Sequence, residues 1–111
     1  MKTKENIQEF EELVLLAILK LGTGAYGAAI HEQLEEAGRN VAIGALYTTL
    51  SRLEKKGYIS SWMGEATAER GGRAKKFFKV EASGETLLAT ARNYRRYLSP
   101  DPGYAMEGGA A

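Results

Sequence analysis

Residues 44–57, Gly-Ala-Leu-Tyr-Thr-Thr-Leu-Ser-Arg-Leu-Glu-Lys-Lys-Gly, are the stretch that determines the fold. Apolar side chains recur here every three or four residues, which is the period of an amphipathic helix. Gly57 is a typical helix stop, and Lys55 and Lys56 stand in the last turn, where the helix dipole favours positive charge. The pattern predicts a helix from residue 43 to about residue 56. Its inward face is expected to comprise Ile43, Leu46, Tyr47, Leu50 and Leu53.

The opposite face of this helix is small, hydroxyl-bearing and basic. Small residues allow close approach to a large ligand, hydroxyl groups can bind phosphates or base edges, and an arginine can bind guanine or phosphate. The face therefore suits double-stranded DNA, although an ordinary solvent-facing side has the same composition. Its residues are expected to be Gly44, Ala45, Thr48, Thr49, Arg52 and Lys55.

Two helices are predicted before this one. The first is apolar on nearly every side, and a chain of 111 residues has only a modest core with which to cover it. We therefore expect a second subunit to cover part of this helix. The second helix follows a glycine-rich break, with Tyr26, Ile30, Leu34 and Ala37 inward, and stops at Gly38. The apolar residues of the first helix are Phe10, Leu13, Val14, Leu15, Leu16, Ala17, Ile18, Leu19 and Leu21.

Beyond Gly57 the pattern becomes that of a hairpin. Residues 58–63 and 77–80 are predicted strands, separated by a segment rich in Gly, Arg and Glu. A basic tip containing glycines can reach phosphates or the minor groove, and a solvated loop would have the same composition. The cations of this tip are Arg70, Arg73, Lys75 and Lys76.

A last helix is predicted from Ser83, whose hydroxyl can cap it, to residue 98. Its apolar stripe comprises Leu87, Ala91, Tyr94 and Leu98. Residues 100–111 are rich in Gly and Ala and are expected to form a disordered tail. The predicted organisation is a unit at 1–82, a last helix at 83–99, and this tail.

Charge is concentrated in the middle of the chain. The net charge is +1, but residues 39–79 hold nine Lys or Arg against three Glu, whereas residues 1–38 hold three against seven. Phosphate binding rewards local rather than total charge, so the middle segment suits a nucleic-acid partner. A solvated basic face would show the same distribution.

Composition excludes several other classes. The absence of cysteine rules out disulfide frameworks, thiolate zinc sites and cysteine nucleophiles. His31 is the single histidine and has no cluster of carboxylates at ligand spacing, so we expect no metal, no cofactor and no enzymatic activity. The longest apolar run, residues 13–19, is too short to span a membrane, and acidic residues precede it where a signal peptide would be basic. We expect a cytoplasmic protein.

Residues 22–27 match the dinucleotide-binding pattern Gly-x-Gly-x-x-Gly. That motif requires a preceding strand and an acidic residue about 20 positions further on. Here the preceding segment has helical period, and no acidic residue stands at that distance beyond Gly27. We therefore reject this interpretation.

The predicted order of three helices, a two-stranded hairpin and a helix is that of a winged helix-turn-helix, an α+β fold that is mostly α. The segments 13–19, 26–27, 44–57 and 72–78, with Gly84, resemble regulators of the PadR family over about residues 9–98. Leu-Tyr-x-x-Leu-x-x-Leu-Glu-x-x-Gly, beginning at Leu46, is the most distinctive piece. The resemblance implies a winged-helix dimer, usually a repressor, whose last helix packs with the first at the dimer interface.

The chain departs from the family pattern at several positions. Thr48 stands where the family usually has proline, Phe77 and Phe78 replace a common tyrosine pair, and Glu81 occupies a usual threonine position. The single helix after the hairpin corresponds to the short branch of the family. These differences concern the chemistry at the groove rather than the fold, so the operator sequence does not carry over.

The expected function is sequence-specific binding of double-stranded DNA by a homodimer on a near-palindromic operator, with a protein-protein adaptor as the rival. A small aromatic effector would contact Tyr94, Tyr97 and Trp62, whose alternative roles are dimer and hairpin packing. The predicted DNA-binding residues are Gly44, Ala45, Tyr47, Thr48, Thr49, Arg52, Lys55, Arg70, Arg73, Lys75 and Lys76. The predicted dimer-interface residues are Phe10, Leu15, Leu16, Leu19, Leu88, Ala91, Tyr94 and Leu98.

Overall fold

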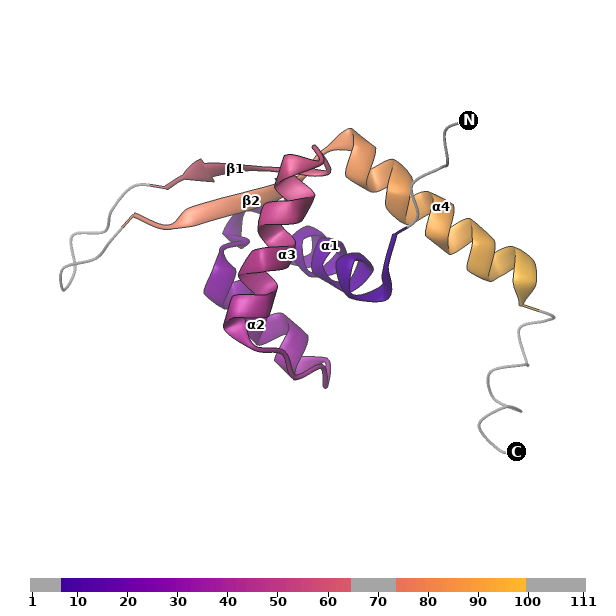
Figure 1. Ribbon diagram of the computed structural model, residues 1–111, viewed down its shortest axis with the longest axis horizontal. Coiled ribbons are helices and arrows are strands. Elements are labelled where there is room, and N and C mark those ends of the chain that lie inside the picture. The colour runs from indigo at the N-terminus through magenta and orange to yellow at the C-terminus, as the bar shows by residue number, and fades with distance from the viewer. Residues whose placement is uncertain (1–6, 65–73, 100–111) are drawn as a thin grey trace.

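The structure is a computed structural model that describes residues 7–64 and 74–99. The predicted order of helices and strands is confirmed (Figure 1). Expectations for Arg70, Arg73 and the C-terminal tail fall outside the described residues. The elements are α1 (Glu9–Leu21), a short 3₁₀ turn η1 (Gly22–Gly24), α2 (Gly27–Glu36), α3 (Ile43–Lys55), β1 (Ile59–Met63), β2 (Lys76–Val80) and α4 (Ala82–Leu98).

Helices α1, α2 and α3 form one bundle, with the hairpin on one side and α4 extending away on the other (Figure 1). Helix α1 contacts α2, α3, α4 and β2, so elements of its own chain cover it on several sides. Burial of these apolar side chains is the main favourable contribution to folding. The largest fully buried side chains are Val14, Leu15, Ile18, Ile30, Leu46, Leu50, Leu53 and Ile59.

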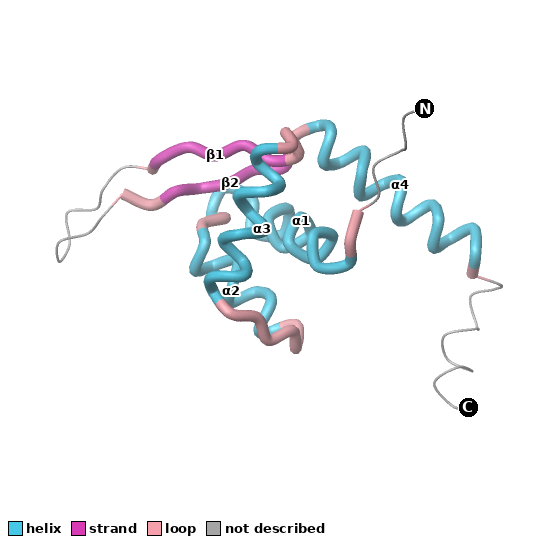
Figure 2. The backbone as a smooth tube through the Cα atoms, in the orientation of Figure 1, coloured by secondary structure: helices cyan, strands magenta, loops and turns pink. Residues whose placement is uncertain are grey.

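The hairpin is fastened to the helical bundle through the segment before α2. Strands β1 and β2 pair antiparallel, with Ile59 opposite Val80 (Figure 2). The backbone N–H of Phe78 donates a hydrogen bond of 2.8 Å to the carbonyl of Ala25, and Tyr26 forms a bridge with Phe77. This added pairing fixes the middle of β2 relative to the start of α2.

The start of α4 differs from the prediction. Glu81 rather than Ser83 is the N-cap residue, and the Ser83 hydroxyl instead donates to the carbonyl of Gly57 at 2.7 Å. Gly84 is buried, and a side chain there would overlap the carbonyl oxygen of Tyr58. The predicted Ser83 cap is therefore wrong, because the hydroxyl holds α4 against the turn between α3 and β1.

Three of the residues expected at a subunit interface are buried within the single chain. Leu15 lies in the core that surrounds α1, and Leu88 and Ala91 lie on the inner side of α4. Elements of the same subunit already cover these three side chains, so they offer little surface to a second copy. The remaining large side chains of that set stay exposed, namely Leu16, Leu19, Tyr94 and Leu98, while Phe10 is half-buried.

Candidate nucleic-acid interface

The outer face of α3 is a line of small, hydroxyl-bearing and basic residues. Gly44, Thr48, Ser51 and Lys55 follow one another at three- or four-residue spacing and are all exposed. The Thr48 hydroxyl donates to the carbonyl of Gly44 at 3.0 Å, which leaves its oxygen free to accept a hydrogen bond. These residues therefore form an exposed polar surface, mostly of short side chains, on a helix whose other side is buried in the core.

Ser51 was not among the residues expected from the sequence, and Thr49, Ile43 and Tyr47 were expected on the wrong side of α3. Thr49 is 5% exposed because it lies three residues after Leu46 and four before Leu53, inside the buried stripe. Ile43 was expected inward but is exposed, since it is the first residue of α3. The spacing of Ser51 from Thr48 and Lys55 was the signal that would have identified it.

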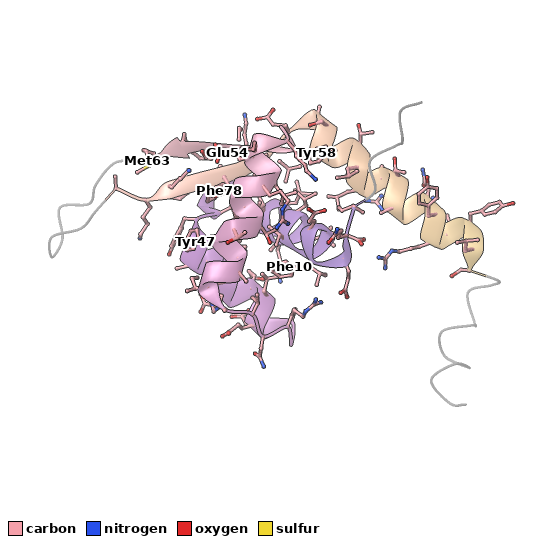
Figure 3. The ribbon with its side chains drawn as sticks, in the orientation of Figure 1. Phe10, Tyr47, Glu54, Tyr58, Met63 and Phe78 are labelled. Atoms are coloured by element: carbon pink, nitrogen blue, oxygen red, sulfur yellow. The ribbon has the colours of Figure 1, made fainter. Side chains whose placement is uncertain are left out.

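Tyr47 lies on one flank of α3, beside the start of α2 (Figure 3). A side chain at Gly27 would overlap the Tyr47 hydroxyl, so the ring passes directly over that glycine. Tyr47 is nevertheless about half exposed, which corrects its expected inward orientation. Gly27 thus allows α2 and the Tyr47 ring to approach closely, and the ring stays accessible beside the outer line.

Arg52 and Ala45 lie on the opposite flank of α3, and both are exposed. A guanidinium nitrogen of Arg52 is 3.6 Å from a carboxylate oxygen of Glu11 on α1. Arg52 is therefore accessible, but its charge is already balanced by a neighbour within the chain.

The hairpin is held at a defined position relative to α3 by Glu54, which is labelled at the upper end of the helix in Figure 3. Its carboxylate accepts a hydrogen bond of 2.5 Å from the Ser61 hydroxyl on β1 and lies 3.5 Å from the Lys76 ammonium on β2. The Lys75 ammonium lies 4.5 Å from the centre of the Tyr26 ring. Both lysines are exposed, so the hairpin presents positive charge beside the end of α3.

The other candidate residues, His31 and Trp62, make contacts within the fold. A ring nitrogen of His31 lies 2.7 Å from the carbonyl oxygen of Val41, which links α2 to the loop before α3. Trp62 stacks on Phe77 with ring centres 5.6 Å apart. Residues 7–64 and 74–99 contain no cluster of His, Asp or Glu that could hold a metal ion. Within the same residues, no helix is sufficiently long and apolar to traverse a bilayer.

The segment preceding Gly22 is helix α1 rather than a strand, which confirms the rejection of a dinucleotide-binding site. Three packed helices, the third with a polar exposed face, and a hairpin fastened beside it define a winged helix-turn-helix protein. The family model described as "Transcriptional regulator PadR-like family" matches residues 15–90. The chain therefore belongs to the PadR-like family of transcriptional regulators.

Solved structures show the same fold. A PadR-like transcription factor from Bacteroides fragilis is 26% identical, with a TM-score of 0.67 over 92% of this chain and 89% of that one. A Streptococcus transcriptional regulator is 25% identical, with a TM-score of 0.67 over 92% of each chain. A PadR-family regulator from Clostridium difficile shares the fold at 22% identity and a TM-score of 0.68, over 92% of this chain and 99% of that one. No curated protein matches this chain in sequence.

Proposed function

We propose that this PadR-like protein is a transcriptional repressor that binds a near-palindromic DNA operator as a homodimer. The observation that carries the proposal is the exposed line of Gly44, Thr48, Ser51 and Lys55 on a helix whose opposite side is fully buried. The major groove admits a helix, and a small polar face allows its backbone to approach the base edges. Such a protein acts by binding rather than by catalysis.

Positive charge from the hairpin supports the same orientation on DNA. Lys76 lies beside the end of α3 and Lys75 lies over the Tyr26 ring just before α2, and we expect both, together with Arg70 and Arg73, to contact phosphates flanking the groove. Phosphate contacts, including one from Lys55 at the end of the outer line, set the register of the protein on the duplex, while the rest of the outer line reads the sequence. This division of roles predicts different consequences for substitutions in the two regions.

Exposed apolar side chains on α1 and α4 support the homodimer. Leu16 and Leu19 on α1 and Tyr94 and Leu98 on α4 are all exposed in the single chain. Pairing two copies through these residues would bury apolar area and would duplicate α3. We expect the two half-site centres to lie about one helical turn apart, roughly 34–36 Å.

Titration of fluorescent duplexes tests the proposal. Duplexes from the DNA upstream of the protein's own gene should bind more tightly than scrambled duplexes of equal length. If the dimer makes about 6–10 phosphate contacts, affinity should fall by about 10³–10⁵ between 50 and 200 mM salt. Binding that is insensitive to salt, or equal for both duplexes, would contradict the proposal, and the second outcome would favour the adaptor.

A matched pair of lysine variants sharpens this experiment. Lys55 ends the outer line of α3, whereas Lys20 is exposed on α1. Lys55→Ala should lower the salt dependence by about two phosphate contacts, one from each subunit, and Lys20→Ala should leave it unchanged. Equal effects from both variants would mean that the charge acts at long range and that α3 is not the contact surface.

Binding of a small aromatic effector stays a prediction. Trp62 borders a depression of about 220 Å³ together with Leu19 and Val80, a size and lining that suit a small apolar ring. Tyr94 and Tyr97 lie exposed on α4. Because Trp62 is the single tryptophan, quenching of its fluorescence by aromatic compounds would detect such a ligand directly.

A further inference from the structure

Three carboxylates at the start of α1 each pair with an arginine from a different part of the chain. The first turn of a helix favours acidic residues, because its N–H groups carry partial positive charge. Here the same residues also connect α1 to the loop after α2, to α3 and to α4. The pairs are Glu9 with Arg39 at 3.1 Å, Glu11 with Arg52 at 3.6 Å, and Glu12 with Arg95 at 2.7 Å.

The pair of Glu11 and Arg52 differs from the other two because its carboxylate is the most buried and because its arginine lies on α3. The side chain of Glu11 is 7% exposed, against 66% for Glu9 and 14% for Glu12. One carboxylate oxygen of Glu11 accepts a hydrogen bond of 3.1 Å from the backbone N–H of Gln8, and the other faces Arg52. A buried carboxylate is costly to leave without a counter-charge, so Glu11 holds Arg52 more firmly than an exposed partner would.

Arg52 keeps part of its binding capacity despite this pair. Its side chain is 45% exposed, and the 3.6 Å separation exceeds the length of a good hydrogen bond. A guanidinium group has five N–H donors, so donors remain for a second partner. The nearby Glu11 carboxylate balances the charge of Arg52 without using all of its hydrogen bonds.

We propose that Glu11 is a positioning residue that makes Arg52 selective for a base edge rather than for phosphate. When a buried carboxylate balances the charge of a guanidinium, contact with phosphate adds little binding free energy. Phosphate is present at every position along DNA. A guanine edge, with two acceptors, can still accept hydrogen bonds from the free donors at one correct position. Glu11 thereby weakens sequence-independent binding and raises the ratio of operator to non-operator affinity. This inference rests on the proposed function.

Glu11→Gln provides the test, because glutamine has the same size and can still accept the Gln8 N–H. The freed Arg52 charge should tighten binding to a scrambled duplex by about fivefold to tenfold per subunit near 0.1 M salt. The slope of log affinity against log salt should steepen by about 0.9 per subunit, or about 1.8 for the dimer, the equivalent of two phosphate contacts. Operator affinity should rise less, so that the selectivity ratio falls.

Glu12→Gln is the matched control. It removes the same charge one residue further along α1, but its partner Arg95 belongs to α4. The control should leave the salt slope and the selectivity ratio at wild-type values. In an Arg52→Ala background, Glu11→Gln should have no further effect, which separates the pair from a general change in charge or stability.

Arg52→Ala alone gives an independent result if Glu11→Gln does not fold. Because Glu11 already balances Arg52, this variant should lose operator affinity while binding to the scrambled duplex stays within twofold of wild type. Equal losses on both duplexes would overturn the proposal, as would a wild-type salt slope in folded Glu11→Gln. Absence of any selective complex in the wild-type protein would instead overturn the proposed function, and this inference with it.

Discussion

Helices α3 and α4 each leave one side exposed, and the two sides differ in chemistry. The outer line of α3, Gly44, Thr48, Ser51 and Lys55, contains no large apolar side chain. The last two turns of α4 expose Tyr94, Tyr97 and Leu98, the last of them by 74%. An apolar surface is stabilised by an apolar partner, whereas a small polar one suits a hydrated, charged ligand. The comparison agrees with the proposed roles, in which α3 binds DNA and α4 binds a second copy of the chain.

The largest expected effect comes from placing a charge on the exposed end of α4. Tyr94→Asp should weaken dimerisation by about 100-fold or more, because an unpaired carboxylate replaces an aromatic ring that the proposed dimer would bury. Analytical ultracentrifugation over a concentration series measures the change. Thr86→Asp, on an exposed position near the start of the same helix, is the control and should leave the dimer intact. A fully dimeric Tyr94→Asp would remove α4 from the interface.

Arg52→Ala is expected to have the next largest effect. Operator affinity should fall by about 1–3 kcal/mol if Arg52 contacts a base, and the loss should concentrate at one base-pair position of each half-site. Titration of operators carrying single base-pair changes measures this. Unchanged affinity for every duplex would place the flank of α3 outside the interface and restrict recognition to the outer line.

The sequence predicted helices α1 and α3, but it did not predict which elements pack against them. The period of Leu46, Leu50 and Leu53 predicted α3, and its extent agrees with the structure to within one residue. Thr49 belonged to the same buried period but was assigned outward because threonine is polar. For Leu15, the pattern showed that α1 needed cover on several sides, but not that α2, α3, α4 and β2 supply it.

Contacts between distant parts of the chain were beyond the reach of the sequence. Arg52 was expected at the groove, yet its pair with Glu11 joins residues far apart in the chain, and no local pattern predicts it. The same holds for Ser83, whose local setting suggested a helix cap and whose hydrogen bond goes instead to the carbonyl of Gly57. Periodicity shows which face of an element is apolar, but not which neighbour meets each polar group.

A smaller effect is expected where the Tyr47 ring of α3 passes over Gly27 of α2. Gly27→Ala should displace the Tyr47 ring and lower stability by about 1 kcal/mol, the low end for overpacking because the ring can rotate toward solvent. Urea denaturation measures this change. Gly44→Ala is the control, since an added methyl there meets nothing within 4 Å, and it should stabilise α3 by about 0.5–1 kcal/mol. Equal destabilisation by both variants would contradict this account of Gly27.

The smallest effect is expected at the junction between α3 and the hairpin. Glu54→Gln removes the charge that faces Lys76 but keeps an acceptor for Ser61, so global stability should fall by about 0.5 kcal/mol or less. Hydrogen exchange should nevertheless accelerate in β1 and β2 and remain unchanged in α1. Uniform acceleration across the chain would show that Glu54 supports the whole fold rather than the position of the hairpin.

Methylation interference on the operator tests the central claim, that the outer face of α3 enters the major groove twice. Methylation at N7 of guanine obstructs the major groove, whereas methylation at N3 of adenine obstructs the minor groove. We predict two clusters of inhibitory guanine N7 positions, centred about one helical turn apart and related by the operator's twofold symmetry. A single cluster, or inhibition by adenine N3 methylation alone, would contradict the account.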